Sequence, residues 1–222
     1  MNRCRLVSTI LSLAAVVVSA VVVRAQGKPR VSLDDLGAGK GWKVFNRTVT
    51  AAKEDGRTVV RFDERPGMGV AWIEGLDFTD GVIEVDIKGR DVDQKSFLGV
   101  AFRGVDDTTY DAVYFRPFNF RSDDPVRRSH AVQYISQPTN TWKQLRTEHP
   151  GAYEKPVHPT PDPKGWFHAR IVLAKPKVSV YVDNAKEPSL VVDELSDRKG
   201  GWVGFWIGDD SDGAFANLKI KK

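Results

Sequence analysis

The sequence is very poor in cysteine, which limits how the protein can be stabilised. Its 222 residues include a single cysteine, Cys4, so no disulfide can form within the chain and no four-cysteine zinc site exists. Histidine is scarce too, and the four histidines lack the spacing of metal ligands. We therefore expect a fold held by its hydrophobic core, with no catalytic thiol and no metal centre built on histidine.

The sequence also lacks charge of one sign and the common nucleotide motifs. Lys and Arg number 33 and Asp and Glu 29, a balance too even to indicate a nucleic-acid-binding protein. A hydrophobic share of 41% and a charged share of 28% are ordinary for globular proteins and exclude disordered, collagenous and coiled-coil chains. No G-x-S-x-G, phosphate-binding loop or dinucleotide fingerprint is present, so no organic cofactor is expected.

One long hydrophobic run stands at the beginning of the chain. Residues 6–23 are apolar or carry small hydroxyl groups, follow two arginines and precede Arg24 and Ala25. This pattern predicts a secretory signal peptide over residues 1–25, although a run of this length is also close to the shortest that spans a membrane. Cleavage after Ala25 would remove Cys4 and three arginines. The mature protein would then be nearly neutral and exported to the periplasm or the cell exterior, without a membrane segment.

From residue 42 onward, the pattern is typical of β-strands. Short runs of β-branched and aromatic residues alternate with polar ones between clusters of Gly, Pro, Asp and Asn, and no amphipathic helix is evident. Many short strands with no dividing linker predict one domain over residues 26–222, an all-β, two-sheet antiparallel β-sandwich of jelly-roll type. The clearest strands cover residues 58–62, 69–73, 82–88, 97–103, 110–116, 131–136, 166–173, 178–183, 202–207 and 214–220.

Two long polar stretches interrupt the strands, at residues 117–129 and 147–165. Loops of this length are uncommon in compact domains and are often functional. The alternative is a pair of surface insertions, which cost little free energy. We favour a functional role because aromatic and arginine positions flank the first loop.

Three segments together resemble a known superfamily. They are FTDGVIEVDIKG at 78–89, SFLGVAFRGVDDTTYDAVYFRPFNF at 96–120 and GGWVGFWIGDDSDGAFANLKI at 200–220. They are similar to the concanavalin A-like lectin/glucanase superfamily, and within it to 3-keto-disaccharide hydrolase-type and laminin G-like domains. The resemblance implies a jelly roll that acts on or binds carbohydrate. Because the superfamily holds enzymes and non-catalytic modules, it implies a glycosidic-bond hydrolase or, alternatively, a lectin-like or laminin G-like binding module.

The predicted strands at 82–88 and 110–116 contain carboxylates that could serve in catalysis. Family 16 glycoside hydrolases of this superfamily carry an E-x-D-x-E strand, and this chain has Glu84 and Asp86 followed by Lys88. The period of two places the three side chains on one face of the strand. Retaining hydrolysis needs two carboxyl groups about 5 Å apart, and Lys88 occupies the second position. Glu84, Asp86 and Asp111 are therefore our candidate acid or base groups, and a charged solvent face is the alternative for the first two.

Alternating aromatic and polar positions mark a candidate sugar site. Tyr110, Tyr114 and Arg116 share one face of their strand, and Arg103 and Trp206 lie on the corresponding faces of two others. Sugar rings stack on aromatic side chains while planar polar groups bind their hydroxyls; core packing is the alternative use of such rings. The predicted substrate-binding residues are Arg103, Tyr110, Tyr114, Arg116, Asn119, Gln133 and Trp206.

Two further clusters refine this expectation. Several arginines in and around the long loops favour an acidic or sulfated glycan, unless they form a solvated basic loop balanced by neighbouring aspartates. The turn at 209–213 (DDSDG) supplies clustered oxygens that a structural calcium ion could use, or is simply an Asp-rich hairpin turn. No metal ligand is assigned from the sequence. The expected partner is a carbohydrate or glycoside.

Overall fold

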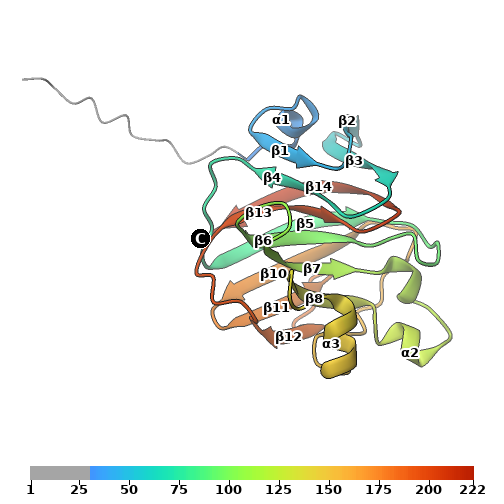
Figure 1. Cartoon of the computed structure of the whole chain (residues 1–222). Coiled ribbons are helices and arrows are strands. Elements are labelled where there is room, and N and C mark those ends of the chain that lie inside the picture. Colours follow the sequence, from blue (N-terminus) through green and yellow to red (C-terminus); the bar gives the residue numbers. More distant parts are fainter. Residues whose placement is uncertain (1–30) are drawn as a thin grey trace, which may run out of the picture.

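The computed structural model describes residues 31–222, and the expected signal peptide at 1–25 lies outside these residues. The described chain forms two antiparallel sheets of seven strands each, packed face to face (Figure 1). This arrangement confirms the predicted all-β jelly-roll sandwich. Among residues 31–222 no helix is both long enough and apolar enough to cross a membrane.

The first sheet, sheet A, carries the site described below. Its neighbours pair in the order β1-β4-β13-β6-β7-β8-β9. The strands are β1 (Trp42–Phe45), β4 (Gly69–Ile73), β13 (Trp202–Ile207), β6 (Leu98–Gly104), β7 (Tyr110–Phe115), β8 (Val132–Gln137) and β9 (Glu154–Lys155).

The second sheet, sheet B, covers the other side of the core. Its order is β12-β11-β10-β5-β14-β3-β2. The strands are β12 (Leu190–Asp193), β11 (Lys177–Val182), β10 (Phe167–Ala174), β5 (Gly81–Lys88), β14 (Ser211–Lys221), β3 (Arg57–Arg65) and β2 (Val49–Glu54).

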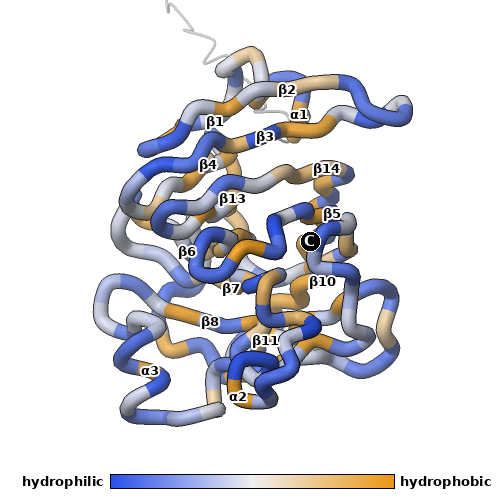
Figure 2. Tube along the Cα trace, turned by 90° about the vertical axis from the view of Figure 1, so that its right-hand side faces the viewer, coloured by the Kyte–Doolittle hydropathy of each residue, from blue (hydrophilic) through white to orange (hydrophobic). Residues whose placement is uncertain are grey.

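The two sheets differ in how their outer faces are covered. In β10 and β5 of sheet B, buried residues alternate with partly exposed ones, so one face packs on the core and the other meets solvent. In β7 of sheet A every residue is buried. The outward side chains of sheet A form a second apolar cluster, separate from the core between the sheets. Figure 2 shows the resulting mixture of hydrophobic and hydrophilic residues along β8 and β11.

Short helices lie at the ends of the sandwich. Helix α1 (Leu33–Gly37) lies near β2 and β3, whereas α2 (Pro125–Arg128) and α3 (Trp142–Glu148) lie near β8 (Figure 1). A single 3-10 turn covers Pro117–Asn119. The two long polar stretches are thus partly ordered: the first holds this turn and α2, and the second begins at the end of α3 and contains β9.

Candidate functional site

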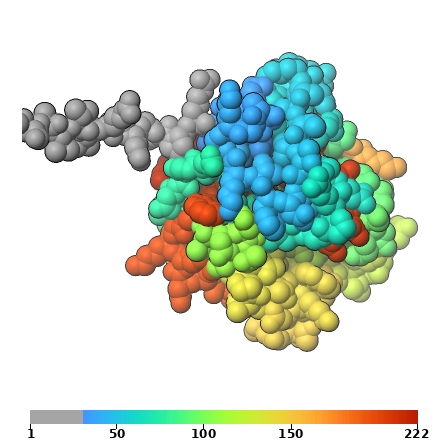
Figure 3. All heavy atoms as spheres, turned by 45° about the horizontal axis from the view of Figure 1, so that its top comes forward, coloured from blue at the N-terminus to red at the C-terminus, as the bar shows by residue number. Residues whose placement is uncertain are grey.

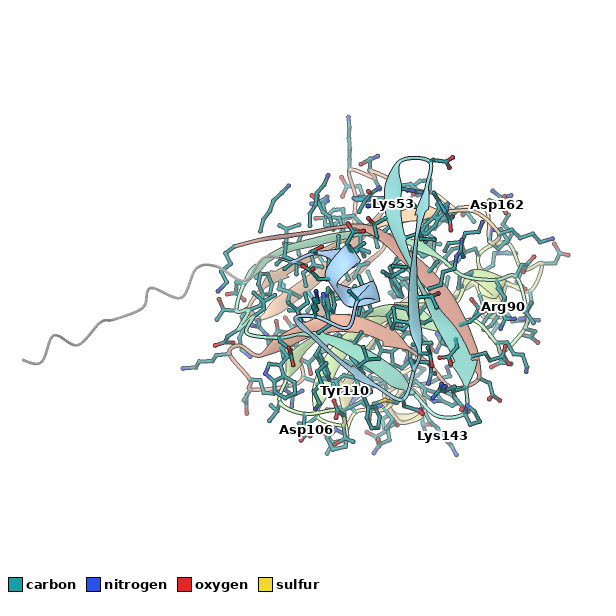
Figure 4. The ribbon with its side chains drawn as sticks, turned by 90° about the horizontal axis from the view of Figure 1, so that it is seen from above. Lys53, Arg90, Asp106, Tyr110, Lys143 and Asp162 are labelled. Atoms are coloured by element: carbon teal, nitrogen blue, oxygen red, sulfur yellow. The ribbon has the colours of Figure 1, made fainter. Side chains whose placement is uncertain are left out.

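A cavity of about 590 Å³ opens on the outer face of sheet A. It lies where β7 and β13 end and β4 and β6 begin, and α2 and α3 close one side of it. The view in Figure 4 places Tyr110, one of its residues, on the opposite side of the molecule from Lys53 and Asp162. Its lining consists of Met68, Gln94, Phe97, Tyr110, Tyr114, Arg116, Asn119, Arg127, His130, Gln137, Trp142, Arg146, Trp206, Gly208, Asp209 and Asp210.

Aromatic rings form the floor of this cavity. The ring centroids of Tyr114 and Trp206 are 4.7 Å apart, and Phe97 packs edge-on against Tyr114 at 6.3 Å. Trp206 Nε1 donates a hydrogen bond of 3.0 Å to the Tyr110 hydroxyl. Burial raises the pKa of Tyr110 to about 12, so this hydroxyl stays protonated at physiological pH. The floor is therefore apolar and fixed in position.

The sheet register explains why the two central rings meet. Trp206 of β13 pairs with Gly99 of β6, and Gly99 pairs in turn with Tyr114 of β7. Gly99 has no side chain, so the rings on either side can approach each other over its backbone. A Cβ atom there would come 2.1 Å from the carbonyl oxygen of Val113. Glycine at this position therefore holds the strands close together and forms part of the floor.

A buried polar network borders the aromatic floor. The Tyr114 hydroxyl donates a hydrogen bond of 2.9 Å to Gln133 Oε1 across the β7–β8 pair. Arg116 Nη2 donates to the Tyr114 hydroxyl at 2.5 Å and to Gln133 Oε1, and Nη1 donates to the His130 carbonyl at 2.7 Å. Arg116 is only 4% exposed and Gln133 is fully buried. These bonds fix the guanidinium at the wall of the cavity.

One buried carboxylate, that of Glu154 in β9, serves three basic side chains. Arg146 of α3 donates to both of its oxygens, at 2.9 and 2.7 Å. Arg116 Nη1 lies 3.7 Å from Glu154 Oε2, and His130 Nε2 lies 3.2 Å from Oε1. Two guanidinium groups thus share a single carboxylate, which leaves a surplus of positive charge on this wall.

Burial also affects the titration of His130. Desolvation disfavours the imidazolium, and the pKa of His130 is lowered even though Glu154 acts in the opposite direction. Nearby Arg146 and Arg116 add to the lowering. His130 is therefore neutral at physiological pH.

Helices α2 and α3 supply the side walls. Thr141 caps α3 in a reciprocal capping box with Gln144, and the first helical residue, Trp142, is 47% exposed. The Arg146 guanidinium lies 5.2 Å from the centroid of the Trp142 ring. In α2, Arg127 forms a 2.5 Å ion pair with Asp93. Trp142 is thus a solvent-accessible aromatic side chain at the cavity rim.

The turn between β13 and β14 contributes the cavity's acidic residues. Asp209 Oδ1 accepts a hydrogen bond of 2.5 Å from the Gly67 backbone, and Asp210 has a left-handed φ of 47°. Asp212, in the same sequence cluster, forms a 2.6 Å ion pair with Arg90. Among residues 31–222 no group of three or more His, Cys, Asp or Glu side chains is placed to hold a metal ion.

Most of the residues predicted to bind substrate come together here. Tyr110, Tyr114, Arg116, Asn119 and Trp206 all line the cavity. Gln133 lies directly beneath, bonded to Tyr114 and Arg116. The period-two alternation of β7 and β13 accounts for the common face of Tyr110, Tyr114 and Trp206.

Arg103 lies elsewhere, at the opposite end of β6. The pairing of β6 with β13 shifts register between Trp202 and Gly204, and Arg103 has a left-handed φ of 53° at this bulge. The bulge interrupts the alternation from which its outward position was predicted. Its fully buried side chain instead pairs with Glu194 at 2.8 Å and Asp80 at 2.9 Å. Arg103 therefore links sheet A to segments that flank sheet B.

Glu84 and Asp86 share a face of their strand as predicted, but that face is the outer surface of sheet B. Asp86 Oδ1 lies 2.8 Å from His168 Nδ1, and Oδ2 accepts hydrogen bonds from Arg57 and Asn217. Glu84 lies 3.5 Å from the Lys221 ammonium. Neither residue lines the cavity, because β5 belongs to the other sheet.

Asp111 also lies away from the cavity. It neighbours Tyr110 in β7, but its side chain points to the opposite face of the sheet, as alternation requires. It is fully buried, bonded to Arg198 at 2.5 Å and to the Ser196 hydroxyl at 2.7 Å. None of the three carboxylates predicted to be catalytic lies among the cavity residues.

Several cavity residues were not identified as site residues from the sequence. Some of them lie next to predicted strands, in the turn after β13 and in the segment before β6. The capping box formed by Thr141 and Gln144 is a sequence signal that could have located α3. No sequence pattern indicates that α3 and β9 pack beside β8. Four further lining residues were expected in other roles: Arg127 and Arg146 in the arginine group that favours an acidic glycan, and Asp209 and Asp210 in the possible calcium turn. The remaining lining residues are Met68, Gln94, Phe97, His130, Gln137, Trp142 and Gly208.

Solved structures with the same architecture are numerous. The carbohydrate-binding module CBM66 from Bacillus subtilis superposes with a TM-score of 0.58 at 15% identity, covering 82% of this chain and 96% of that one. A protein of unknown function with a galectin-like fold, also from Bacillus subtilis, matches with a TM-score of 0.54 at 13% identity, covering 86% of this chain and 92% of that one. The exoplasmic/lumenal domain of VIP36 in its Ca²⁺/Man-bound form matches with 0.52 at 11% identity, covering 82% and 84%.

These likenesses support the fold alone: a jelly-roll β-sandwich of two antiparallel sheets. No protein-family model matches the sequence. No curated protein matches it either.

Proposed function

We propose that this protein binds carbohydrate in the cavity on the outer face of sheet A. The observation that carries the proposal is the pairing of an aromatic floor, Tyr114 and Trp206, with a hydrogen-bonded guanidinium, Arg116, at its border. Apolar CH faces of a sugar ring stack on such rings, and planar polar groups bind the hydroxyls around its edge. The carbohydrate-binding module CBM66 and the Ca²⁺/Man-bound domain of VIP36 share the fold, which supports a carbohydrate ligand.

Binding without catalysis is favoured over hydrolysis. Retaining and inverting glycosidases both need two carboxyl groups flanking the glycosidic bond. The carboxylates predicted for that role, Glu84, Asp86 and Asp111, point away from the cavity and have partners of their own. The groups at the wall instead resemble a recognition surface, with donors on Arg116, acceptors on Asp209 and exposed aromatic area on Trp142.

The test is a binding screen with a paired variant. Oligosaccharides of xylan, mannan, β-1,3-glucan, fructan and polygalacturonate are immobilised, and the affinity of the best binder is measured by calorimetry. Trp142→Ala should weaken binding at least tenfold, about 1.4 kcal/mol, because it removes the exposed ring at the rim. The control Trp166→Ala removes a ring that packs on Arg57 at the outer face of sheet B and should leave the affinity unchanged. Equal affinities for Trp142→Ala and the wild type would refute the site.

A second candidate function is glycoside hydrolysis, favoured by the one observation that Asp209 and Asp210 both line the cavity. Under this alternative the two carboxylates would serve as acid and base. Chromatography of the glycan after incubation would show shorter products, and Asp210→Asn would abolish them. If the glycan stays intact after prolonged incubation with saturating protein, hydrolysis is refuted and the binding function stands.

We also propose that the protein acts outside the cytoplasm as a single domain after removal of residues 1–25. The support is the sequence pattern of that segment. Amino-terminal sequencing of the protein recovered from the culture supernatant or periplasm should begin after Ala25. A start at Met1 would contradict export by cleavage.

A further inference from the structure

A second, smaller cavity of about 270 Å³ lies on the outer face of sheet A toward its edge strand β1. It shares no residue with the first cavity. Its lining combines two tryptophans with one basic and one acidic side chain. The residues are Lys43, Trp72, Ile73, Glu74, Gly75 and Trp202.

The two cavities are joined by a row of touching aromatic side chains. Tyr110 lines the first cavity, and its ring packs edge-on against Trp72 with centroids 5.8 Å apart. Trp72 lines the second cavity and packs in the same manner against Trp202, also at 5.8 Å. On the other side, Tyr110 is bonded to Trp206 of the first cavity's floor. One aromatic row thus reaches from Trp206 to Trp202.

Glycine residues give this row a rigid base. Gly104 pairs with Trp202 across β6 and β13, and a Cβ atom there would lie 2.8 Å from the Trp72 ring. At Gly204, paired with Trp72, a Cβ atom would lie 2.2 Å from the Ala71 carbonyl oxygen. The Trp72 ring therefore packs closely on the backbone at Gly104, and Gly204 lets β13 approach β4 closely.

Polar groups surround the rings of the second cavity. Lys43 Nζ lies 5.3 Å from the centroid of the Trp202 ring and 2.8 Å from Asp107 Oδ2. Trp72 Nε1 donates to the other Asp107 oxygen at 2.9 Å. Glu74 adds a second carboxylate to the lining. Lys43 belongs to β1 and Asp107 to the turn between β6 and β7. In Figure 3 the blue spheres of the β1 region lie against the green spheres of this turn.

We infer that the second cavity is a subsite for further residues of the same glycan, so that the ligand is an oligosaccharide rather than a single sugar. This inference rests on the proposed carbohydrate-binding function. A partly exposed tryptophan flanked by an ammonium and a carboxylate suits a sugar residue for the same reasons as the first cavity. The shared aromatic wall places the two cavities next to each other on one face of one sheet.

Affinity as a function of chain length tests this inference. The monosaccharide and the tetrasaccharide of whichever of the five screened glycans binds best are titrated into the wild type, Trp202→Ala and Trp142→Ala. The wild type should bind the tetrasaccharide at least tenfold more tightly than the monosaccharide. Trp202→Ala should lose this gain and keep the wild-type affinity for the monosaccharide. Trp142→Ala should weaken the binding of both sugars.

A second variant guards against disturbance of the Trp72 packing. Lys43→Met leaves both rings in place and removes an ammonium that can donate hydrogen bonds to sugar hydroxyls, so it should also reduce the tetrasaccharide affinity, by about threefold or more. Wild-type tetrasaccharide affinity in both variants, or no gain with length in the wild type, would overturn the subsite while leaving the first site intact. Loss of monosaccharide affinity in Trp202→Ala would equally overturn it, because the ring would then only support the first cavity. If none of the screened glycans binds the wild type, the proposed carbohydrate-binding function is itself refuted.

Discussion

At the residue scale, three basic side chains at the wall of the first cavity surround the carboxylate of Glu154. Glu154 accepts both hydrogen bonds from Arg146 while Arg116 and His130 lie close by. A protonated His130 would be a third cation around one buried carboxylate. The folded protein therefore favours the neutral imidazole of His130.

The depressed pKa of His130 predicts a loss of stability in mild acid. Because burial lowers this pKa below its ordinary value of 6.5, the unfolded chain binds the proton at a higher pH than the folded protein. The stabilisation is present above pH 6.5 and is lost as the pH falls from there through the lowered pKa. Urea unfolding at about pH 7.5 and about pH 5.5 should show a larger fall in the free energy of unfolding for the wild type than for His130→Gln. Parallel falls would contradict the prediction.

At the scale of elements, alternation identified the central strands and failed at the edges. The four strands without a prediction, β1, β2, β9 and β12, are the end strands of the two sheets. An edge strand is covered by a neighbour on one side only, and natural edges are short or rich in charge. In β2 no residue is fully buried. Its sequence therefore does not need alternating hydrophobic residues, and the strand could not be predicted from them.

The contact between β6 and β7 at Gly99 can be tested directly. Gly99→Ala would place a Cβ atom 2.1 Å from the Val113 carbonyl and 2.6 Å from Tyr114 Cα, so the strands must move apart. We expect a loss of about 1 to 3 kcal/mol in the free energy of unfolding and weaker glycan binding, because the Tyr114 ring shifts. Gly165→Ala is the matched control: its Cβ atom would come no nearer than 3.3 Å to any neighbour. Thermal and urea unfolding of both variants, with calorimetric titration of the glycan, would show whether the cost is specific to the strand pair.

At the scale of the whole molecule, the two sheets are held together by the apolar core and, at one end, by Arg103. This guanidinium is fully buried and pairs with Glu194, which is itself fully buried, and with the half-exposed Asp80. It also donates to the backbone carbonyls of Thr79 and Lys199. Among residues 31–222, removing it would leave Glu194 one ion-pair partner, Lys175, 3.4 Å away.

Arg103→Met should therefore be strongly destabilising. Breaking a buried ion pair by removing one partner typically costs about 3 to 5 kcal/mol, and urea unfolding would measure it. Arg65→Met is the comparison, because Arg65 pairs with Asp63 at an exposed position where the expected cost is about 0 to 1 kcal/mol. Similar losses in the two variants would contradict an inter-sheet role for Arg103. A preserved fold with lost glycan affinity would restore Arg103 as a binding residue.

The fold class and the outward face of the central strands of sheet A follow from the amino-acid pattern alone. Period-two alternation in a chain without disulfides requires a two-sheet core, and the same alternation brought Tyr110, Tyr114 and Trp206 to one surface. The sheet that each strand joins, and with it the position of the carboxylates, depends on how the strands pair in the folded protein. Glu84 and Asp86 belong to sheet B, and a bulge turns Arg103 inward. Alternation is a local property of one strand, whereas a site is assembled from strands and helices that are distant in the chain.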